Sequence, residues 1–298
     1  MATTHWRDNH ITELNDALEL LTDTIEDDRD GVSRKVNWES TKSFENNQNI
    51  VINGENIEFN LVRVSYDLIE NSIISDGTPS RKSFFVIPYK VNNIIRYIIN
   101  INTGALTVLR RLLSYTGRNE ITAITYSFTN DFFTWLINKV YSRNNRIESN
   151  AVDGNTWRID YIMGVKGDTS DLQSKVSATG ETVINIISTL AFLLESDHLN
   201  EIKLSMSSLV HECVNLTLKN SNITTEQKSY QGEFESYNND EELARIYLLV
   251  YREIIPFLVQ SYLDDCENNL WGINCYNHFI RNIAEEIERR IQDLLSIE

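Results

Sequence analysis

The sequence has few of the features typical of secreted or membrane-spanning proteins. Its 298 residues include only three cysteines, Cys213, Cys266 and Cys275, and this odd number in a long chain argues against a disulfide framework. No apolar run approaches the roughly 20 residues that cross a bilayer. The first residues, MATTHWRDNHITELND, lack the charged-then-apolar pattern of a signal peptide. We therefore expect a cytoplasmic protein without membrane insertion.

The sequence also lacks the short motifs that identify common active sites. It contains no Gly-x-Ser-x-Gly nucleophile elbow and no Gly-x-Gly-x-x-Gly dinucleotide fingerprint. His198 and the run His211-Glu212-Cys213 offer few metal ligands, and no paired Cys-x-x-Cys or His-x-x-x-His accompanies them. We therefore predict no metal site, no cofactor and no catalytic residue, and we favour a protein that is not an enzyme.

Acidic residues are missing from one segment of an otherwise acidic chain. The formal net charge is −16, which normally disfavours binding to nucleic acid. Residues 1–80 contain 6 basic and 16 acidic side chains, whereas residues 81–119 contain 7 basic and no acidic ones. The wider window 81–146 has 10 basic and 2 acidic residues. This local excess of positive charge favours contact with phosphate groups.

The spacing of the apolar residues predicts a protein of mixed α and β structure. Helical spacing indicates an amphipathic helix over 10–28, and turn signals with alternating apolar residues indicate strands over 49–66 and a hairpin over 83–101. Strands and helices then alternate to residue 228. Two long helices are expected at 239–263, with a kink near Pro256, and at 273–296. We predict an α+β fold in which a mixed sheet is covered by helices and ends in a C-terminal helical hairpin.

The same patterns divide the chain into three segments. These are an N-terminal amphipathic helix over 1–33, an α/β body over 34–228 and a C-terminal helical segment over 229–298. The first helix either packs on the body or binds a partner. The dense apolar stripes of the last helices indicate core packing, and self-association of these helices is the main alternative.

The basic segment is the first candidate site. Its side chains could neutralise several phosphates if they share one face, and Tyr89, Tyr97 and Tyr115 could stack on bases. The alternative is that these basic residues pair with the acidic terminal regions. The predicted nucleic-acid-binding residues are Arg81, Lys82, Lys90, Arg96, Arg110, Arg111, Arg118, Arg143 and Arg146.

A second candidate site is the polar stretch over 164–181, which we expect to be a loop before a helix. Glycines would bring its backbone close to a ligand, and a helix N-terminus attracts anions. Its candidate anion-binding residues are Lys166, Lys175, Ser177 and Thr179. The spacing does not match a Walker loop, and a capped helix after a surface loop explains the same residues.

A third pattern suggests a metal-dependent nuclease. Such enzymes place an Asp on one strand and a Glu-x-Lys on the next, where they hold a metal and activate water. Glu201-Ile-Lys203 has this form, and Asp160 lies in an earlier predicted strand. Matches of three residues arise often by chance.

The layout of the chain resembles that of some bacterial antiphage proteins. Short strands, the segment FFVIPYKVNNIIRYIININ before a helix, a middle α/β stretch and a helical end are similar to the DNA-binding subunit of Kiwa-type systems and the phage Rex-type exclusion protein. The resemblance covers residues 83–228 in outline. It implies sequence-nonspecific DNA binding in phage defence.

Two functions from different classes remain open. The first is a non-enzymatic subunit that binds or senses DNA or RNA through the basic segment. The second is an adaptor or scaffold that binds a protein partner, or a second copy of itself, through its acidic helices.

Overall fold

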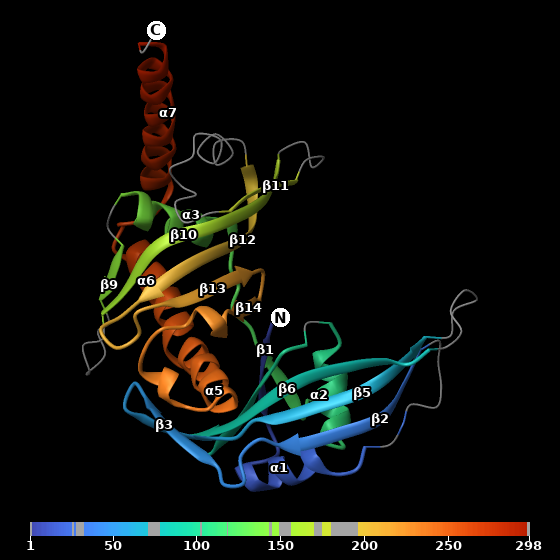
Figure 1. The fold of residues 1–298 in the computed structure, drawn as a ribbon. Coiled ribbons are helices and arrows are strands. Elements are labelled where there is room, and N and C mark those ends of the chain that lie inside the picture. Colours follow the sequence, from blue (N-terminus) through green and yellow to red (C-terminus); the bar gives the residue numbers. More distant parts are fainter. Residues whose placement is uncertain are drawn as a thin grey trace. The chain divides into compact units, whose positions relative to one another are not determined.

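The computed structural model describes residues 2–25, 27, 33–70, 78–101, 103–117, 119–142, 145–148, 156–169, 175–179 and 196–296. The chain groups into two compact units, which are Met1–Thr125 with Tyr237–Tyr247, and Tyr126–Ser236 with Leu248–Glu298. Each unit is built on a β-sheet with helices packed against it (Figure 1). The predicted α+β class is therefore confirmed.

The arrangement of strands differs in detail from the expectation of one mixed sheet. The described strands form two separate sheets, and all their ladders are antiparallel. Tight hairpins account for much of this pattern, because a short turn can join only antiparallel strands. The units also differ from the expected three segments, since the N-terminal helix belongs to the first unit and the last 70 residues are divided between both.

Among the described residues, the first sheet has eight strands in the order β2-β5-β6-β7-β1-β8, with β4 pairing β3 and β6. The two predicted hairpins turn at Asn53-Gly54 and Asn92-Asn93, all four with positive φ. The short strand β1 was not expected from the sequence. The strands are β1 (Thr4–Asp8), β2 (Ser33–Lys42), β3 (Gln48–Ile52), β4 (Glu55–Phe59), β5 (Val62–Glu70), β6 (Ser80–Val91), β7 (Ile94–Ile99) and β8 (Ile121–Ile124).

Two helices cover one face of the first sheet. These are α1 (Leu14–Thr22) and α2 (Ala105–Leu112), which begins after Gly104 (φ 78) without a side-chain cap. Their apolar side chains pack on alternate residues of β5, β6 and β7, and the resulting core contains Leu14, Leu18, Leu21, Val108, Leu109, Val62, Val64, Phe84, Val86, Ile95, Tyr97 and Ile99. The N-terminal helix thus contributes to the core of this unit.

The start of helix α5 (Asn239–Leu249) packs on the opposite face of the same sheet. Arg63 Nε donates to Asp240 Oδ2 at 3.1 Å, and Ser43 Oγ donates to the same carboxylate at 2.6 Å. The Tyr247 ring lies 5.4 Å from that of Phe85. The hydrogen bond from Arg63 lowers the pKa of Asp240, so this carboxylate stays ionised at the helix N-terminus, where negative charge is favourable.

The second sheet has six strands among the described residues, in the order β11-β10-β12-β13-β14, with β9 paired to β10. Helix α3 (Asn130–Tyr141) contacts β10 and β12, and the Thr129 side chain caps it by accepting from Phe132 N. The strands are β9 (Arg146–Glu148), β10 (Thr156–Thr169), β11 (Lys175–Thr179), β12 (Ser196–Ser207), β13 (Val214–Lys219) and β14 (Asn222–Thr225). Two 3₁₀ turns follow, η2 (Gln227–Ser229) and η3 (Glu233–Ser236).

The helix expected near residues 239–263 extends over Asn239–Glu267. It contains α5, a π-helical segment η4 (Val250–Ile254) and α6 (Ile255–Glu267). Pro256 lacks an N–H and cannot complete a regular α-helical ladder, and the π-helical turn lies directly before it. This helix is long and apolar enough to cross a membrane, but 56% of its most apolar window is buried inside the fold, as in the core helix of a soluble protein.

The last helix, α7 (Ile273–Leu295), follows a short connection after α6. In Figure 1 it continues beyond the end of α6 and does not fold back along it, so the expected helical hairpin is not formed. The position of α7 follows from its contacts with α3. The buried side chains of α7 pack against α3, and the Phe279 ring lies 5.7 Å from the Tyr141 ring.

A buried polar cluster occupies the core of the second unit. The His211 ring stacks on Trp157 at 5.6 Å, and its Nδ1 lies 2.8 Å from the Tyr230 hydroxyl. Trp157 Nε1 donates to Glu253 Oε1 at 2.8 Å. His211 therefore packs in an aromatic core, and no group of metal-binding side chains occurs within the described part of the chain.

Burial of His211 makes the stability of the second unit depend on pH. Burial lowers the pKa of His211 from 6.5 to about 4. Between pH 6.5 and about pH 4, His211 binds a proton in the unfolded chain but stays neutral in the folded protein. Stability is therefore greatest above pH 6.5 and falls toward pH 4, by at most about 3 kcal/mol. Urea unfolding at a series of pH values should show this loss, and His211→Gln should reduce it.

The matched control is His278→Gln, which removes an exposed histidine from α7. It should leave the pH dependence unchanged. An equal effect of both substitutions would contradict the assignment to His211.

Candidate nucleic-acid interface

Several of the predicted phosphate-binding residues are engaged in ion pairs within the first unit. Arg81 pairs with Glu39 and with Asp67. Lys90 Nζ lies 2.7 Å from Glu13 Oε2, and Arg110 Nη2 lies 3.7 Å from Glu120 Oε2. Arg81 and Lys90 thus pair with carboxylates of the acidic N-terminal region, as in the alternative, whereas Arg110 pairs with Glu120 outside that region.

The predicted basic residues also do not share one face. Side chains alternate along a strand, so Arg81 and Lys82 on β6 point to opposite faces. Arg96 lies opposite Tyr89 in the ladder and therefore shares the face of Arg81. Arg146 lies on β9 of the second unit, and Arg118 and Arg143 lie outside the described residues.

The three tyrosines proposed for base stacking are engaged in the fold. Tyr89 and Tyr97 are fully buried. Tyr97 and Tyr115 both donate to the buried carboxylate of Asp8, at 2.7 and 2.9 Å. None of these rings is open for stacking on a base.

The second predicted site is not formed as a loop. Residues 164–169 complete β10 and pair with β11, which contains Lys175, Ser177 and Thr179. Lys166 forms an ion pair with Glu201, at 2.5 Å. The side chains of Lys175, Ser177 and Thr179, and the helix predicted after them, lie outside the described part of the structure. The loop prediction was wrong because these residues form a local antiparallel ladder, in which strand pairing overrides their polar composition.

The nuclease pattern is not assembled either. Glu201 lies opposite Lys166 and also contacts Lys219 at 3.3 Å. Asp160 lies near the other end of β10, about six residues and roughly 20 Å away along the strand, and it accepts from Ser207 at 3.0 Å. The two carboxylates cannot hold one metal ion.

A different group of basic and aromatic side chains meets at the rim of the helix-covered face of the first sheet. Lys82 lies directly opposite Tyr66 in the β5–β6 ladder, and Lys35 Nζ lies 5.4 Å from the Tyr66 ring. The Trp38 ring lies 4.6 Å from that of Tyr66, and the Arg111 guanidinium lies 5.4 Å from the Trp38 ring. We call Lys35, Trp38, Tyr66, Lys82 and Arg111 the cation–aromatic cluster.

A β-bulge in β2 brings Lys35 and Trp38 to the same face. The ladder with β5 shifts between Val36 and Glu39, so that one extra residue lies on β2. Residues three apart in a regular strand point to opposite faces. The extra residue corrects this parity, so that Lys35 and Trp38 both contact Tyr66.

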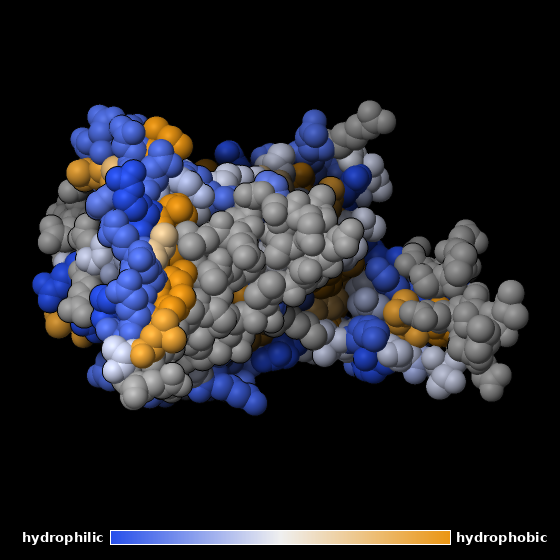
Figure 2. Space-filling view, turned by 90° about the horizontal axis from the view of Figure 1, so that it is seen from above, coloured by the Kyte–Doolittle hydropathy of each residue, from blue (hydrophilic) through white to orange (hydrophobic). Residues whose placement is uncertain are grey.

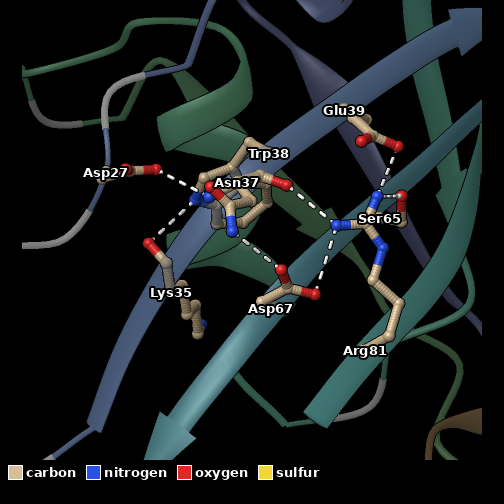
Figure 3. A network of polar contacts seen from close by, with 8 residues as sticks. All are labelled: Asp27, Lys35, Asn37, Trp38, Glu39, Ser65, Asp67 and Arg81. Carbon is tan, nitrogen blue, oxygen red and sulfur yellow. Dashed lines mark hydrogen bonds and ion pairs between the residues drawn. The ribbon is translucent and has the colours of Figure 1, made fainter. Parts of the chain in front are cut away.

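A polar network on the other face holds the bulge (Figure 3). At its centre is Asn37, whose φ of 54° is unusual for a residue other than glycine. Asn37 Nδ2 donates to Asp67 Oδ2 at 2.9 Å, and its backbone N donates to Asp27 at 2.9 Å. Arg81 donates to the Asn37 carbonyl at 3.0 Å and also contacts Asp67 and Glu39. The Arg81 charge thus supports the bulge.

The cluster can contact an anionic polymer because no carboxylate in the described part of the chain forms an ion pair with its two lysines. Lys82 is exposed and Lys35 half-buried, and neither forms an ion pair among the described residues. Tyr66 and Trp38 are half-buried, and burial raises the pKa of Tyr66, so its ring stays neutral. Unpaired ammonium groups beside aromatic rings are typical of sites that contact phosphates and bases.

Only Lys82 and Arg111 of this cluster were among the predicted residues. Lys35, Trp38 and Tyr66 lie in the acidic region 1–80, where a count of charges does not single them out. The run Arg34-Lys35-Val36-Asn37-Trp38 is a local signal for Lys35 and Trp38, whereas Tyr66 has none.

The opposite face carries a pocket of about 360 Å³. Its polar lining includes Glu39, Arg63 and Ser65. Arg63 is paired with Asp240 and Glu39 with Arg81. Because the charges in and beside this pocket are already matched, it offers an anionic polymer less than the cluster does.

Replacement of Asn37 should test the role of the bulge. Asn37→Ala loses the bond to Asp67, and alanine lacks the polar side chain that lets asparagine adopt a left-handed conformation, so we expect a loss of about 1–2 kcal/mol in unfolding free energy. In Asn37→Gly, the glycine adopts the positive φ without strain, so the loss of unfolding free energy should be smaller. Urea unfolding followed by circular dichroism measures both. As a control, Asn56→Ala, at a weak 3.5 Å contact with Asn49, should have little effect; equal losses in all three would refute this role.

No protein-family model matches the chain, and comparison with curated proteins gives no significant match.

Proposed function

We propose that this chain is a non-enzymatic subunit that binds single-stranded nucleic acid through the cation–aromatic cluster. The observation that supports it is the placement of Tyr66 between Lys35 and Lys82, two lysines without carboxylate partners among the described residues. The lysines contact phosphates, and the Trp38 and Tyr66 rings offer an apolar edge to an unpaired base.

Single-stranded nucleic acid fits this surface better than duplex. The cluster is small and has two ammonium groups without an ion pair among the described residues, whereas strong duplex binding requires many phosphate contacts. Aromatic side chains gain energy from bases that are not paired with another strand. The resemblance in layout to the DNA-binding subunit of Kiwa-type systems adds a setting to the proposal, which is antiphage defence in the bacterial cytoplasm.

The direct test is fluorescence anisotropy of the full chain with labelled single-stranded DNA and RNA, and with duplex DNA, at about 50 and about 200 mM salt. We expect single-stranded binding that weakens with salt. The double variant Lys35→Glu/Lys82→Glu should reduce affinity at least about tenfold. It should also reduce the slope of log K against log salt by about 1.4, because two phosphate contacts are lost.

The matched control is Arg146→Glu/Lys228→Glu. It makes the same change in net charge at exposed residues of the other unit, so it separates a local contact from general electrostatic repulsion. Its affinity should stay within about twofold of the unmodified protein. No binding at low salt, or equal losses in the two double variants, would refute the proposed interface.

A second candidate function, an adaptor that acts through its helices, is favoured by the exposed surface of α7. Its apolar residues Ile273 and Leu295 are 72% and 69% exposed. This surface is compatible with nucleic-acid binding elsewhere on the chain.

A further inference from the structure

Helix α7 carries an apolar stripe that is partly exposed to solvent. Figure 2 shows it as an orange line along a helix whose neighbouring face is hydrophilic. Ile273 is 72% exposed and Ile291 is 47% exposed. Ile280 and Ile287 are half-buried, and Ala284 is exposed. A stripe with exposed isoleucines along a helix of 23 residues indicates a surface that a partner can cover.

The contacts of α7 with its own unit lie on a different side of the helix. Phe279 and Ile283 are buried, at 2% and 0% exposed. The Tyr141 hydroxyl donates to the Asn282 carbonyl at 3.4 Å. These contacts hold α7 to the unit through Phe279 and Ile283, which are not members of the stripe.

The stripe has the spacing of a coiled-coil seam. Successive members are separated alternately by four and three residues, and they are Ile273, Asn277, Ile280, Ala284, Ile287 and Ile291. This mean period of 3.5 residues keeps a seam facing one partner helix along its length. An asparagine within such a seam costs stability and favours one register. The spacing therefore indicates a helical partner.

The charges beside the seam identify that partner. Arg281 and Glu288 follow Ile280 and Ile287 directly, so they lie on the same flank, seven residues apart. Both are exposed, and neither forms an ion pair among the described residues. The other charged side of α7 is satisfied within the helix, where Arg289 and Arg290 pair with Glu286.

We propose that the seam of α7 binds the α7 of a second copy of this chain, in antiparallel orientation. A two-fold axis perpendicular to the helices keeps each flank on its own side of the seam. With the axis near Ala284, Arg281 faces the partner's Glu288, and Glu288 faces the partner's Arg281. In a parallel pair, the flank with Arg281 and Glu288 would face the partner's flank with Tyr276, Ile283 and Arg290. That flank offers no alternating charges to match them.

The proposed interface is small. A helix of 23 residues is about 35 Å long, and three heptads of one helix bury an area at the lower end of specific interfaces. The small side chain of Ala284 at the axis permits close approach of the two helices. We therefore expect a dimer with a dissociation constant in the micromolar range.

The test is sedimentation analysis of the full chain between about 1 and 200 µM. The mass should rise with concentration toward twice the 34.5 kDa of one chain. Arg281→Glu and Glu288→Arg should each raise the dissociation constant about tenfold, because each places like charges together at two symmetric positions. The double variant Arg281→Glu/Glu288→Arg restores complementarity only in the antiparallel pair and should dimerise like the unmodified chain.

Glu285→Arg serves as the control, since Glu285 is exposed and lies off the seam; it should leave the dissociation constant unchanged. Ile287→Asp should abolish the dimer, with circular dichroism confirming that the helix content is kept. A monomer at all concentrations would overturn the proposal. Failure of the double variant to recover would overturn the antiparallel arrangement, and an effect of Glu285→Arg equal to the single changes would overturn the assigned contacts.

Discussion

The first unit depends on one extra residue in strand β2. Asn37 adopts a left-handed conformation there, and the ladder with β5 shifts by one position. On one face, the bulge is held by Asp67 and Arg81. On the other face, it sets Lys35 and Trp38 against Tyr66. A one-residue slip reverses the side-chain direction of everything that follows on a strand. The ion pairs of one face thus determine which side chains can meet on the other.

Ion pairs between different segments balance much of the positive charge in the stretch of 39 residues that has no carboxylate. The basic residues of 81–119 find their acidic partners in distant parts of the sequence, such as Glu13 for Lys90 and Asp67 for Arg81. Exposed pairs of this kind add little stability each, but they neutralise charges that would otherwise attract phosphates. Lys35 and Lys82 form no ion pair with any residue that the structure describes, and they lie together beside Tyr66.

The sequence predicted the fold class and most helices and strands, because these depend on local periodicity and turn residues. The hairpin at Asn92-Asn93 and helix α3 are examples. It missed β11, because the polar composition of residues 164–181 concealed a local antiparallel ladder with β10. It missed β1 because β1 pairs with the distant strands β7 and β8. The candidate site was missed in greater part for the same reason. Lys35, Tyr66 and Lys82 are brought together by two ladders and a bulge, and none of these can be read from a charge count.

For helix α7, in contrast, the sequence pattern alone indicates the interface, because the spacing of side chains on a regular helix is fixed. A net charge of −16 opposes self-association, but charges in solution are screened beyond about 8 Å at physiological salt. At the seam only the nearest side chains matter, and Arg281 and Glu288 supply opposite signs on one flank. Two-fold symmetry uses this pair twice, whereas an unrelated acidic partner would gain from Arg281 and lose from Glu288. The sign pattern of the flank therefore favours a copy of the same helix over a partner of uniform charge.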